Sequence, residues 1–391
     1  LIIPNKPIKP QKNMQKNYKR LGDYIQQVDE RNSKLEDLPL MGLSVQKMFI
    51  SSIANTIGSN MANYKIIYKN QFAYIADTSR RGDKIAVALF KDYDKALISQ
   101  AYTPFKIIDS NKLLPEYLMM WLMRPEFDRY ARYKSHGSVR EIFSWEEMCD
   151  VMLPIPDITQ QQALVDEYQT IERRIQLNKQ LCQKLEETAQ DLYRKYFVED
   201  IDTENLPEGW RWGKLGEIAT ITMGQSPVGE SYNTDGVGEI FYQGRSDFGM
   251  RFPTIRMFTN EPTKMAKKDD VLLSVRAPVG DINIAPHNCC IGRGLASIRN
   301  KKKHKSYMFY LTKNLDTVFN VADGEGTIFG SINRDTLSNI DVIIPDDEVV
   351  ELFEEKVSSV DKLYKYKDLE IRKLKELLSL LLAKMGRKEE K

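Results

Sequence analysis

The sequence is poor in cysteine and histidine, with four cysteines and three histidines among 391 residues. Two of the cysteines, Cys289 and Cys290, are adjacent, and this spacing fits neither a disulfide framework nor the C-x₂-C pairs of a zinc site. The histidines, His136, His287 and His304, lie far apart in the chain. We therefore predict free thiols, no structural metal, no cofactor and a reducing, cytoplasmic environment.

The sequence also lacks a long apolar run and an excess of either charge. No stretch reaches the roughly 20 apolar residues of a membrane-spanning helix, and no signal peptide is visible. The formal net charge is +2, and the charged fraction of 29% is ordinary for a soluble protein. This balance neither requires nor excludes nucleic acid, so any basic binding surface has to be local. We expect no membrane partner.

Glycine and proline are absent from Thr159 to Phe197, and this stretch carries a heptad pattern. Apolar residues recur in alternating steps of four and three, which is typical of a coiled-coil seam. Thr159 is the predicted N-cap, with Gln162 three residues later as in a capping box. An amphipathic helix on a globular core is the alternative, but the length and the charged flanks favour a coiled coil. The seam positions are Leu164, Tyr168, Ile171, Ile175, Asn178, Cys182, Leu185, Ala189, Leu192 and Tyr196.

The same pattern recurs near the C-terminus, with each position 189 residues after its counterpart. Even the polar interruption recurs, because Lys367 takes the place of Asn178. Isolated polar seam positions fix register and partner choice at some cost in stability. We therefore predict an internal duplication whose two helices pack against each other as a coiled coil. The second seam comprises Phe353, Val357, Val360, Tyr364, Lys367, Ile371, Leu374, Leu378, Leu381 and Met385.

The rest of the chain is rich in short strand patterns bounded by polar turns, for example residues 64–68, 85–89 and 270–275. Helices are expected over residues 115–133 and 307–318. This pattern predicts an α+β fold with two globular segments. The predicted parts are a leader at 1–19, a first globular segment at 20–157, a central helix at 158–199, a second globular segment at 200–345 and a C-terminal helix at 346–391.

The two globular segments align at their ends. Arg20–Asp23 corresponds to Lys214–Glu217, and the strand that ends at Pro156 corresponds to the strand that ends at Pro345. Between these anchors the two sequences differ almost everywhere. Two segments with similar ends and different sequences between them predict a scaffold of pseudo-twofold symmetry that carries two different recognition surfaces.

Short motifs in this order carry a resemblance to a known family. In the first half, Leu153–Pro156 leads into a glutamine-rich helix start at Gln160–Gln162. Together with the duplication and the two helices, the motifs resemble the DNA-specificity subunit of type I restriction-modification systems, the HsdS family. In the second half the motifs are Lys214–Ile218, Met223–Pro227, Gly244–Phe248, Leu272–Arg276, Gly280–Ile282, Gly324–Gly326 and Ile340–Pro345.

The resemblance implies a DNA-binding subunit without chemistry of its own. Each globular segment would be a target recognition domain that reads one half of a bipartite site in double-stranded DNA. The two helices would pack as an antiparallel coiled coil and act as a spacer. DNA methyltransferase subunits and restriction (translocase) subunits would be the partners. A seam of roughly 33 residues at about 1.5 Å per residue spans about 50 Å, or about one and a half turns of B-DNA.

No stretch of the sequence holds a complete catalytic motif. Gly224–Ser231 has the glycine spacing of a phosphate-binding loop, but Glu230 takes the lysine position and would repel phosphates. The carboxylates at 269–270 and 346–348 are expected in a turn and at a helix N-terminus. We therefore predict no enzyme activity for the chain alone, and a nucleotide hydrolase would need ATP binding that depends on Ser231.

Loop residues of both segments are the candidates for DNA contact, because arginine, lysine and glutamine pair with base edges or phosphates. The lysine run at 301–303 has a solvated turn as its alternative. Four aromatic residues, Tyr130, Tyr133, Trp145 and Phe248, are expected to pack in the core or in loops. The candidates are Arg80, Arg81, Lys84, Lys134, His136 and Arg140 in the first segment, and Gln225, Ser226, Gln243, Arg245, Arg276, Arg293, Lys301, Lys302 and Lys303 in the second.

Two functions of different classes remain open. The first is sequence-specific binding to a bipartite duplex site, which delivers a methyltransferase subunit to each half. The second is a coiled-coil scaffold that mainly bridges protein partners, with little or no sequence-specific reading of DNA.

Overall fold

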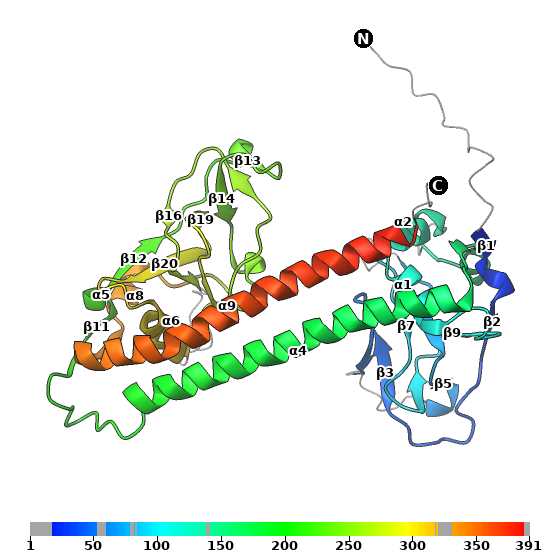
Figure 1. Ribbon diagram of the computed structural model, residues 1–391, viewed down its shortest axis with the longest axis horizontal. Coiled ribbons are helices and arrows are strands. Elements are labelled where there is room, and N and C mark those ends of the chain that lie inside the picture. Colours follow the sequence, from blue (N-terminus) through cyan, green and yellow to red (C-terminus); the bar gives the residue numbers. More distant parts are fainter. Residues whose placement is uncertain are drawn as a thin grey trace, which may run out of the picture. The chain divides into compact units, whose positions relative to one another are not determined.

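The computed structural model describes residues 18–52, 60–78, 82, 84–137, 141–316, 318–319 and 331–386. Two long helices and many short strands make up most of the structure (Figure 1). The chain forms two compact units. The first contains Leu1–Leu177 and Glu370–Lys391, and the second contains Asn178–Leu369. Each unit therefore includes one part of each long helix.

The long helices are α4 (Ile158–Phe197) and α9 (Asp347–Lys384). The predicted N-cap of α4 is wrong, because the side chain of Asp157 accepts the hydrogen bond from the Gln160 backbone N–H at 3.0 Å. Every predicted seam position of both helices is buried or half-buried. Tyr193 and Phe197 are also buried, because the end of α4 packs against an aromatic side chain of the second unit, Tyr307.

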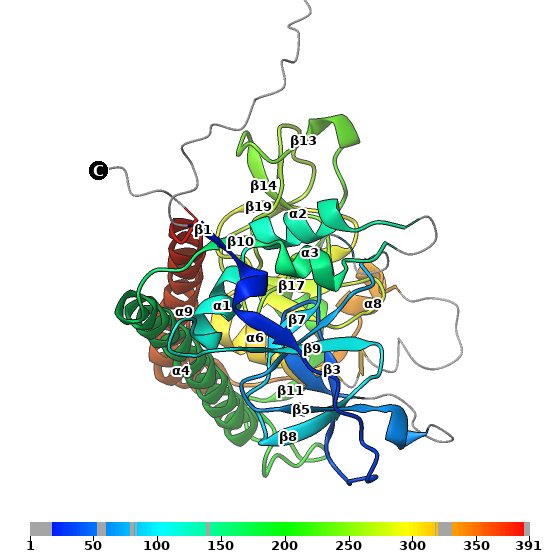
Figure 2. The same cartoon turned by 90° about the vertical axis from the view of Figure 1, so that its right-hand side faces the viewer.

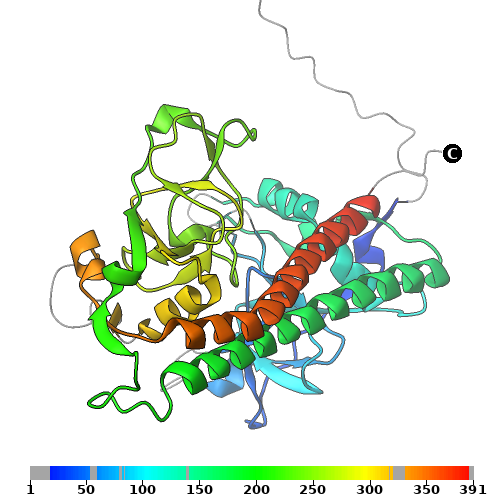
Figure 3. The same ribbon diagram turned by 60° about the vertical axis from the view of Figure 1, so that its left-hand side comes forward.

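The two long helices pack against each other with opposite chain directions, as the antiparallel prediction requires. In successive contacts the residue number increases along α4 and decreases along α9. Figures 1 and 3 both show the helices side by side. The contacts are Arg174–Glu370 at 2.6 Å in the first unit, and Cys182–Tyr364 at 4.0 Å and Phe197–Phe353 ring centroids at 5.2 Å in the second.

The first unit contains two four-stranded sheets, in the orders β2-β9-β6-β7 and β4-β3-β8-β5 (Figure 2). Its first strand, β1, pairs antiparallel with β10, the strand that leads into α4. The elements are β1 (Tyr18–Arg20), β2 (Ile25–Gln27), β3 (Leu40–Leu43), β4 (Phe49–Ser51), β5 (Lys65–Tyr68), β6 (Phe72–Ile75), β7 (Val87–Leu89), β8 (Lys95–Ile98), β9 (Tyr102–Ile107), α1 (Pro115–Leu122), α2 (Pro125–Lys134), α3 (Trp145–Cys149) and β10 (Met152–Pro154).

The single helix expected over 115–133 is interrupted. Pro125 begins a second helix, α2, because proline cannot continue the hydrogen bonding of α1 and disfavours helical geometry in the residue before it. The strands expected over 64–68 and 85–89 are present as β5 and β7.

The second unit contains a four-stranded sheet, β12-β20-β17-β18, and a five-stranded sheet, β13-β15-β14-β19-β16. The strand expected over 270–275 is β17, and the helix expected over 307–318 is α6. The elements are β11 (Arg211–Lys214), α5 (Leu215–Ile218), β12 (Ala219–Met223), β13 (Tyr232–Asn233), β14 (Glu239–Tyr242), β15 (Phe258–Thr259), β16 (Met265–Ala266), β17 (Val271–Ser274), β18 (Ile282–Ile284), β19 (Cys289–Ile291), β20 (Leu295–Asn300), α6 (Lys305–Asn314), α8 (Arg334–Ser338) and β21 (Asp341–Ile344).

The two units share one strand topology. In each, the first strand pairs antiparallel with the strand before the long helix, β1 with β10 and β11 with β21. The sheet β2-β9-β6-β7 has the same order as β12-β20-β17-β18. In the other sheet, β3 runs parallel to β8 as β14 runs parallel to β19. In the second unit, the sheet β12-β20-β17-β18, α6 and both long helices contribute to one hydrophobic core.

Candidate nucleic-acid interface

Four of the predicted DNA-contact residues of the second unit line a single pocket of about 350 Å³. The side chains of Arg276, Arg293 and Gln243 are exposed, whereas Ser226 is half-buried. Hydrogen-bond donors from four separate loops or strand ends therefore face one opening. We call this site the arginine pocket, and its lining is Ser226, Tyr232, Gln243, Arg276, Arg293 and Gly294.

The backbone brings the two arginines together. Arg276 follows the end of β17, and Arg293 follows the end of β19. The backbone N–H of Arg293 donates to Ser226 Oγ at 3.3 Å. A Cβ atom on Gly224 would lie 2.2 Å from the carbonyl oxygen of Gly292, so a glycine is needed for the turn at 224–226 to pack this closely on the arginine loop.

The other five arginines between residues 211 and 299 are neutralised by carboxylates. Arg245, a predicted contact residue, forms an ion pair with Asp281. Among the residues that the structure describes, no carboxylate forms an ion pair with Arg276 or Arg293. The paired arginines between 211 and 299 are Arg211 with Glu217, Arg245 with Asp281, Arg251 with Glu186 and Asp361, Arg256 with Asp247, and Arg299 with Asp270.

The lysine run forms a turn between β20 and α6, away from the lining of the arginine pocket. Lys301 Nζ donates to the carbonyl oxygens of Gly216 at 2.8 Å and Glu217 at 2.9 Å. Lys302 pairs with Asp347 at the start of α9, and Lys303 is exposed in a left-handed conformation with φ 69°. Two of the three lysines thus already have partners within the chain. Gln225 is exposed but does not line the pocket.

The first unit places two of its predicted contact residues side by side. Lys134 Nζ lies 3.2 Å from Glu147, and His136 Nε2 lies 3.9 Å from the same carboxylate. The hydrogen bond to Glu147 raises the pKa of Lys134. Lys84 is exposed. Arg80, Arg81 and Arg140 lie outside the described residues.

The expected packing of the four aromatic residues holds for three of them. Tyr130 packs on Phe143, Trp145 packs on Phe105, and Phe248 packs against a core cluster of the second unit. The prediction is wrong for Tyr133, which is 80% exposed on α2.

The loop at 224–231 has no phosphate-binding geometry. Ser231 is buried, and its hydroxyl lies 2.7 Å from Thr259 Oγ1 and 2.8 Å from the Val228 carbonyl oxygen. A hydroxyl held inside the fold in this way is not presented to a nucleotide, so the loop does not support ATP binding.

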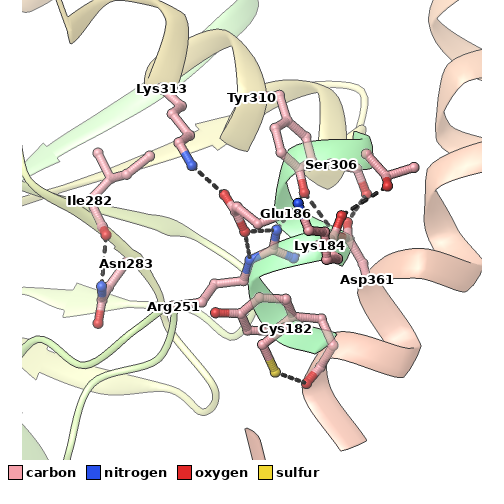
Figure 4. A network of polar contacts seen from close by, with 12 residues as sticks. Cys182, Lys184, Glu186, Arg251, Ile282, Asn283, Ser306, Tyr310, Lys313 and Asp361 are labelled. Carbon is pink, nitrogen blue, oxygen red and sulfur yellow. Dashed lines mark hydrogen bonds and ion pairs between the residues drawn. The ribbon is translucent and has the colours of Figure 1, made fainter. Parts of the chain in front are cut away.

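Sequence reasoning missed Arg251, which is the central residue of a polar network in the second unit (Figure 4). Its guanidinium group contacts Glu186 of α4 and Asp361 of α9, and Tyr364 lies 4.0 Å from it as a cation–π partner. Burial by itself would lower the pKa of Arg251, but the adjoining Tyr310, Glu186 and Asp361 together raise it. No motif marks this residue, because its partners come from helices distant in the sequence.

Little in the described part of the chain points to metal or thiol chemistry. Within the described ranges, no three histidine, cysteine, aspartate or glutamate side chains are grouped to hold a metal ion. All four cysteines are free, and burial raises the pKa of Cys182 to about 11 and that of Cys289 to about 12. Among the described helices, none is long and apolar enough to cross a membrane.

Comparison with known sequences indicates the class of protein to which this chain is similar. Residues 207–379 match the model of the type I restriction modification DNA specificity domain. The match includes the arginine pocket, α6 and most of α9.

Similar proteins extend this assignment beyond the matched domain. A putative type I restriction enzyme MjaX specificity subunit of Methanocaldococcus jannaschii is 29% identical over 70% of this chain and 68% of its own length. The type I restriction enzyme HindI specificity subunit of Haemophilus influenzae is 20% identical over 82% of this chain and 86% of its own length. Together these similarities indicate a specificity subunit of the type I restriction-modification, or HsdS, kind.

A solved structure shares the fold. The type I restriction-modification system S subunit from M. genitalium aligns with a TM-score of 0.60 over 97% of this chain and 98% of its own. Its sequence identity is 15%, so this similarity concerns the fold alone.

Proposed function

We propose that this chain is a specificity subunit that binds a bipartite site in double-stranded DNA. Residues 20–157 and residues 200–345 act as two target recognition domains, and each reads one half-site. The chain carries no catalysis of its own. DNA methyltransferase subunits and restriction (translocase) subunits join it and act on the DNA that it selects.

The observation that carries this proposal is the arginine pocket. Two guanidinium groups without a described carboxylate partner face the same opening as a glutamine amide and a serine hydroxyl. Such donors pair with phosphate oxygens and with the base edges of the grooves.

The shared strand topology supports an internal duplication with pseudo-twofold symmetry. Two copies of one domain would present equivalent loops to the two half-sites. The helices would set the distance between the half-sites, since α4 alone has 40 residues and is about 60 Å long at about 1.5 Å per residue.

An apolar face on α9 supports docking of the methyltransferase subunits. Its exposed side chains follow steps of three, eight and three residues and therefore share one side of the helix. Exposed apolar side chains in such numbers are typical of interaction surfaces. They are Tyr366 at 69% exposure, Leu369 at 53%, Leu377 at 45% and Leu380 at 63%.

The alternative function is a scaffold that mainly bridges proteins. The exposed face of α9 would serve that role equally well. A bridging scaffold would not need the two pocket arginines that lack a carboxylate partner among the described residues. The two functions differ in what happens when one globular segment is exchanged.

The test replaces residues 200–345 with the matching segment of another specificity subunit, in cells that also contain the partner methyltransferase subunit. Sequencing of modified bases should show a methylated motif in which one half changes and the other half and the gap are retained. The reciprocal exchange of residues 20–157 is the control and should change the opposite half. An unchanged motif after both exchanges would leave the scaffold function as the conclusion.

A further inference from the structure

We propose that the arginine pocket binds one phosphate group of the DNA backbone and does not read a base. This inference rests on the proposed function and specifies what the pocket contributes to it. It assigns affinity and register to Arg276 and Arg293, and it leaves sequence discrimination to other loops.

The charges around the pocket favour an anion. Five of the seven arginines between 211 and 299 are paired with carboxylates. The two that have no such partner among the described residues, Arg276 and Arg293, line the same pocket. Two positive groups that share one opening repel each other until an anion lies between them. A phosphate oxygen accepts from both, whereas a neutral base edge leaves most of the charge uncompensated.

The shape of the site points in the same direction. Base edges lie at the floor of a groove about 8.5 Å deep, so the side chains that read them usually project from a helix or a protruding strand. The phosphates form the ridges of the duplex, and a ridge fits a hollow in the protein. The pocket volume of about 350 Å³ exceeds that of a single phosphate, which leaves room for bridging waters at roughly 30 Å³ each.

An extruded base is a less suitable occupant. Pockets that hold a flipped base enclose it between aromatic or apolar side chains. Here Tyr232 is the single aromatic residue in the lining, and two cations lie in the same pocket.

The backbone of the loops that carry Arg276 and Arg293 is held in place before DNA binds. The backbone N–H before Arg276, on Val275, donates to the Gly294 carbonyl oxygen at 3.0 Å, which ties the two arginine loops together. Arg293 is fixed on its other side by its backbone hydrogen bond to Ser226. Loops whose backbone is already fixed need little ordering on binding, which favours a contact with the DNA backbone that positions the protein.

The experiment measures binding of the full chain with its methyltransferase subunit to two duplexes. One duplex carries the methylated motif of the wild type, and the other is a scrambled sequence of equal length and composition. Arg276→Gln and Arg293→Gln should each weaken binding to both duplexes by the same factor, roughly tenfold for one charge-assisted hydrogen bond. Each should reduce the slope of log affinity against log salt by up to about 0.9, the value for one phosphate contact, and the methylated motif in cells should stay the same. Arg293→Lys keeps the charge and should restore the slope.

Arg245→Gln and Arg256→Gln are the matched controls, because carboxylates of the chain already neutralise these arginines. Neither should change the salt slope. All four arginine side chains are exposed. Thermal melts should show wild-type stability for the Arg245, Arg276 and Arg293 variants, whereas Arg256→Gln should melt lower because it leaves the buried Asp247 without its partner.

Two outcomes would overturn the phosphate assignment while the proposed function stands. In the first, a variant of Arg276 or Arg293 loses discrimination at one base of the motif. In the second, these variants and the two controls change the salt slope equally. A wild type that binds both duplexes equally would instead overturn the proposed function, and the phosphate site would still be judged by the slopes.

Discussion

Arg251 Nη1 lies 2.6 Å from Asp361 Oδ1 and joins the loop between β14 and β15 to α9. Arg251 is 1% exposed, and its Nε lies 2.9 Å from Glu186 of α4. One side chain thus contacts both long helices within the second unit. A buried ion pair adds little over apolar packing, but removal of one partner leaves an uncompensated charge.

The first prediction concerns this network. Arg251→Met should lower the free energy of unfolding by about 3–5 kcal/mol in urea denaturation, because Glu186 and Asp361 lose the arginine that they share. The control Arg245→Met removes an exposed pair and should cost about 0–1 kcal/mol. Adding Glu186→Gln and Asp361→Asn to Arg251→Met should recover part of the loss. Equal unfolding midpoints for the two single variants would contradict this role for Arg251.

A second prediction concerns the polar seam position Asn178. It is 3% exposed, and its Nδ2 has no hydrogen-bond partner among the described residues. An unpaired buried amide costs about 1–3 kcal/mol, so Asn178→Leu should raise the unfolding midpoint. Gln183→Leu, at an exposed position of α4, is the control and should stay within about 0.5 kcal/mol of the wild type. A destabilised Asn178→Leu variant would mean that the amide has a role the seam does not explain.

The spacer role predicts a change in the DNA motif. A seven-residue insertion before Asn178, matched in α9, adds one heptad to each helix and preserves the seam. It lengthens the pair by about 10 Å, or about three base pairs at about 3.4 Å each. Sequencing of modified bases should show both half-sites retained with a gap longer by about three base pairs. Methylation of the original spacing at full efficiency would count against a spacer that sets the gap.

The exposed face of α9 predicts how the methyltransferase subunit docks. Leu369→Glu combined with Leu380→Glu should abolish copurification with that subunit and leave thermal stability unchanged, because both side chains already face solvent. Lys375→Glu changes an exposed residue on another side of α9 and should leave copurification intact. Loss of copurification with Lys375→Glu alone would point to a charge effect in place of an apolar surface.

A pH dependence follows from Glu354. Burial raises its pKa, although the backbone N–H of Tyr307 at 2.7 Å acts in the opposite direction. The folded protein therefore keeps a proton that the unfolded chain, with a value near 4.5, has released. Stability falls as pH rises from about 4.5 to the folded-state pKa. Glu354→Gln removes this loss, so the difference in Tm, variant minus wild type, should increase between pH 4 and pH 7.

Glu355→Gln, on the exposed side of the same helix turn, controls for the substitution itself. A Tm difference for Glu354→Gln that does not change with pH would contradict a raised pKa in the folded state.

The long helices were predictable because their signal is local and periodic. Ten seam positions recur at one offset of 189 residues, and burial follows from that period alone. The first residue of a helix is marked less clearly in the sequence than its periodic interior. The sequence therefore predicts Thr159 as the N-cap, although Asp157 takes that position in the structure.

The sequence by itself also determined which loop residues carry donors, since residue type decides what can pair with DNA. Only the tertiary structure decided which of them are available. Arg245 and Arg276 look alike in the sequence, but the fold places Asp281 against the first and leaves the second in a pocket with Arg293. Charge pairing and burial depend on neighbours that are distant in the chain. The same physical reason hid Arg251, whose partners lie 65 and 110 residues away.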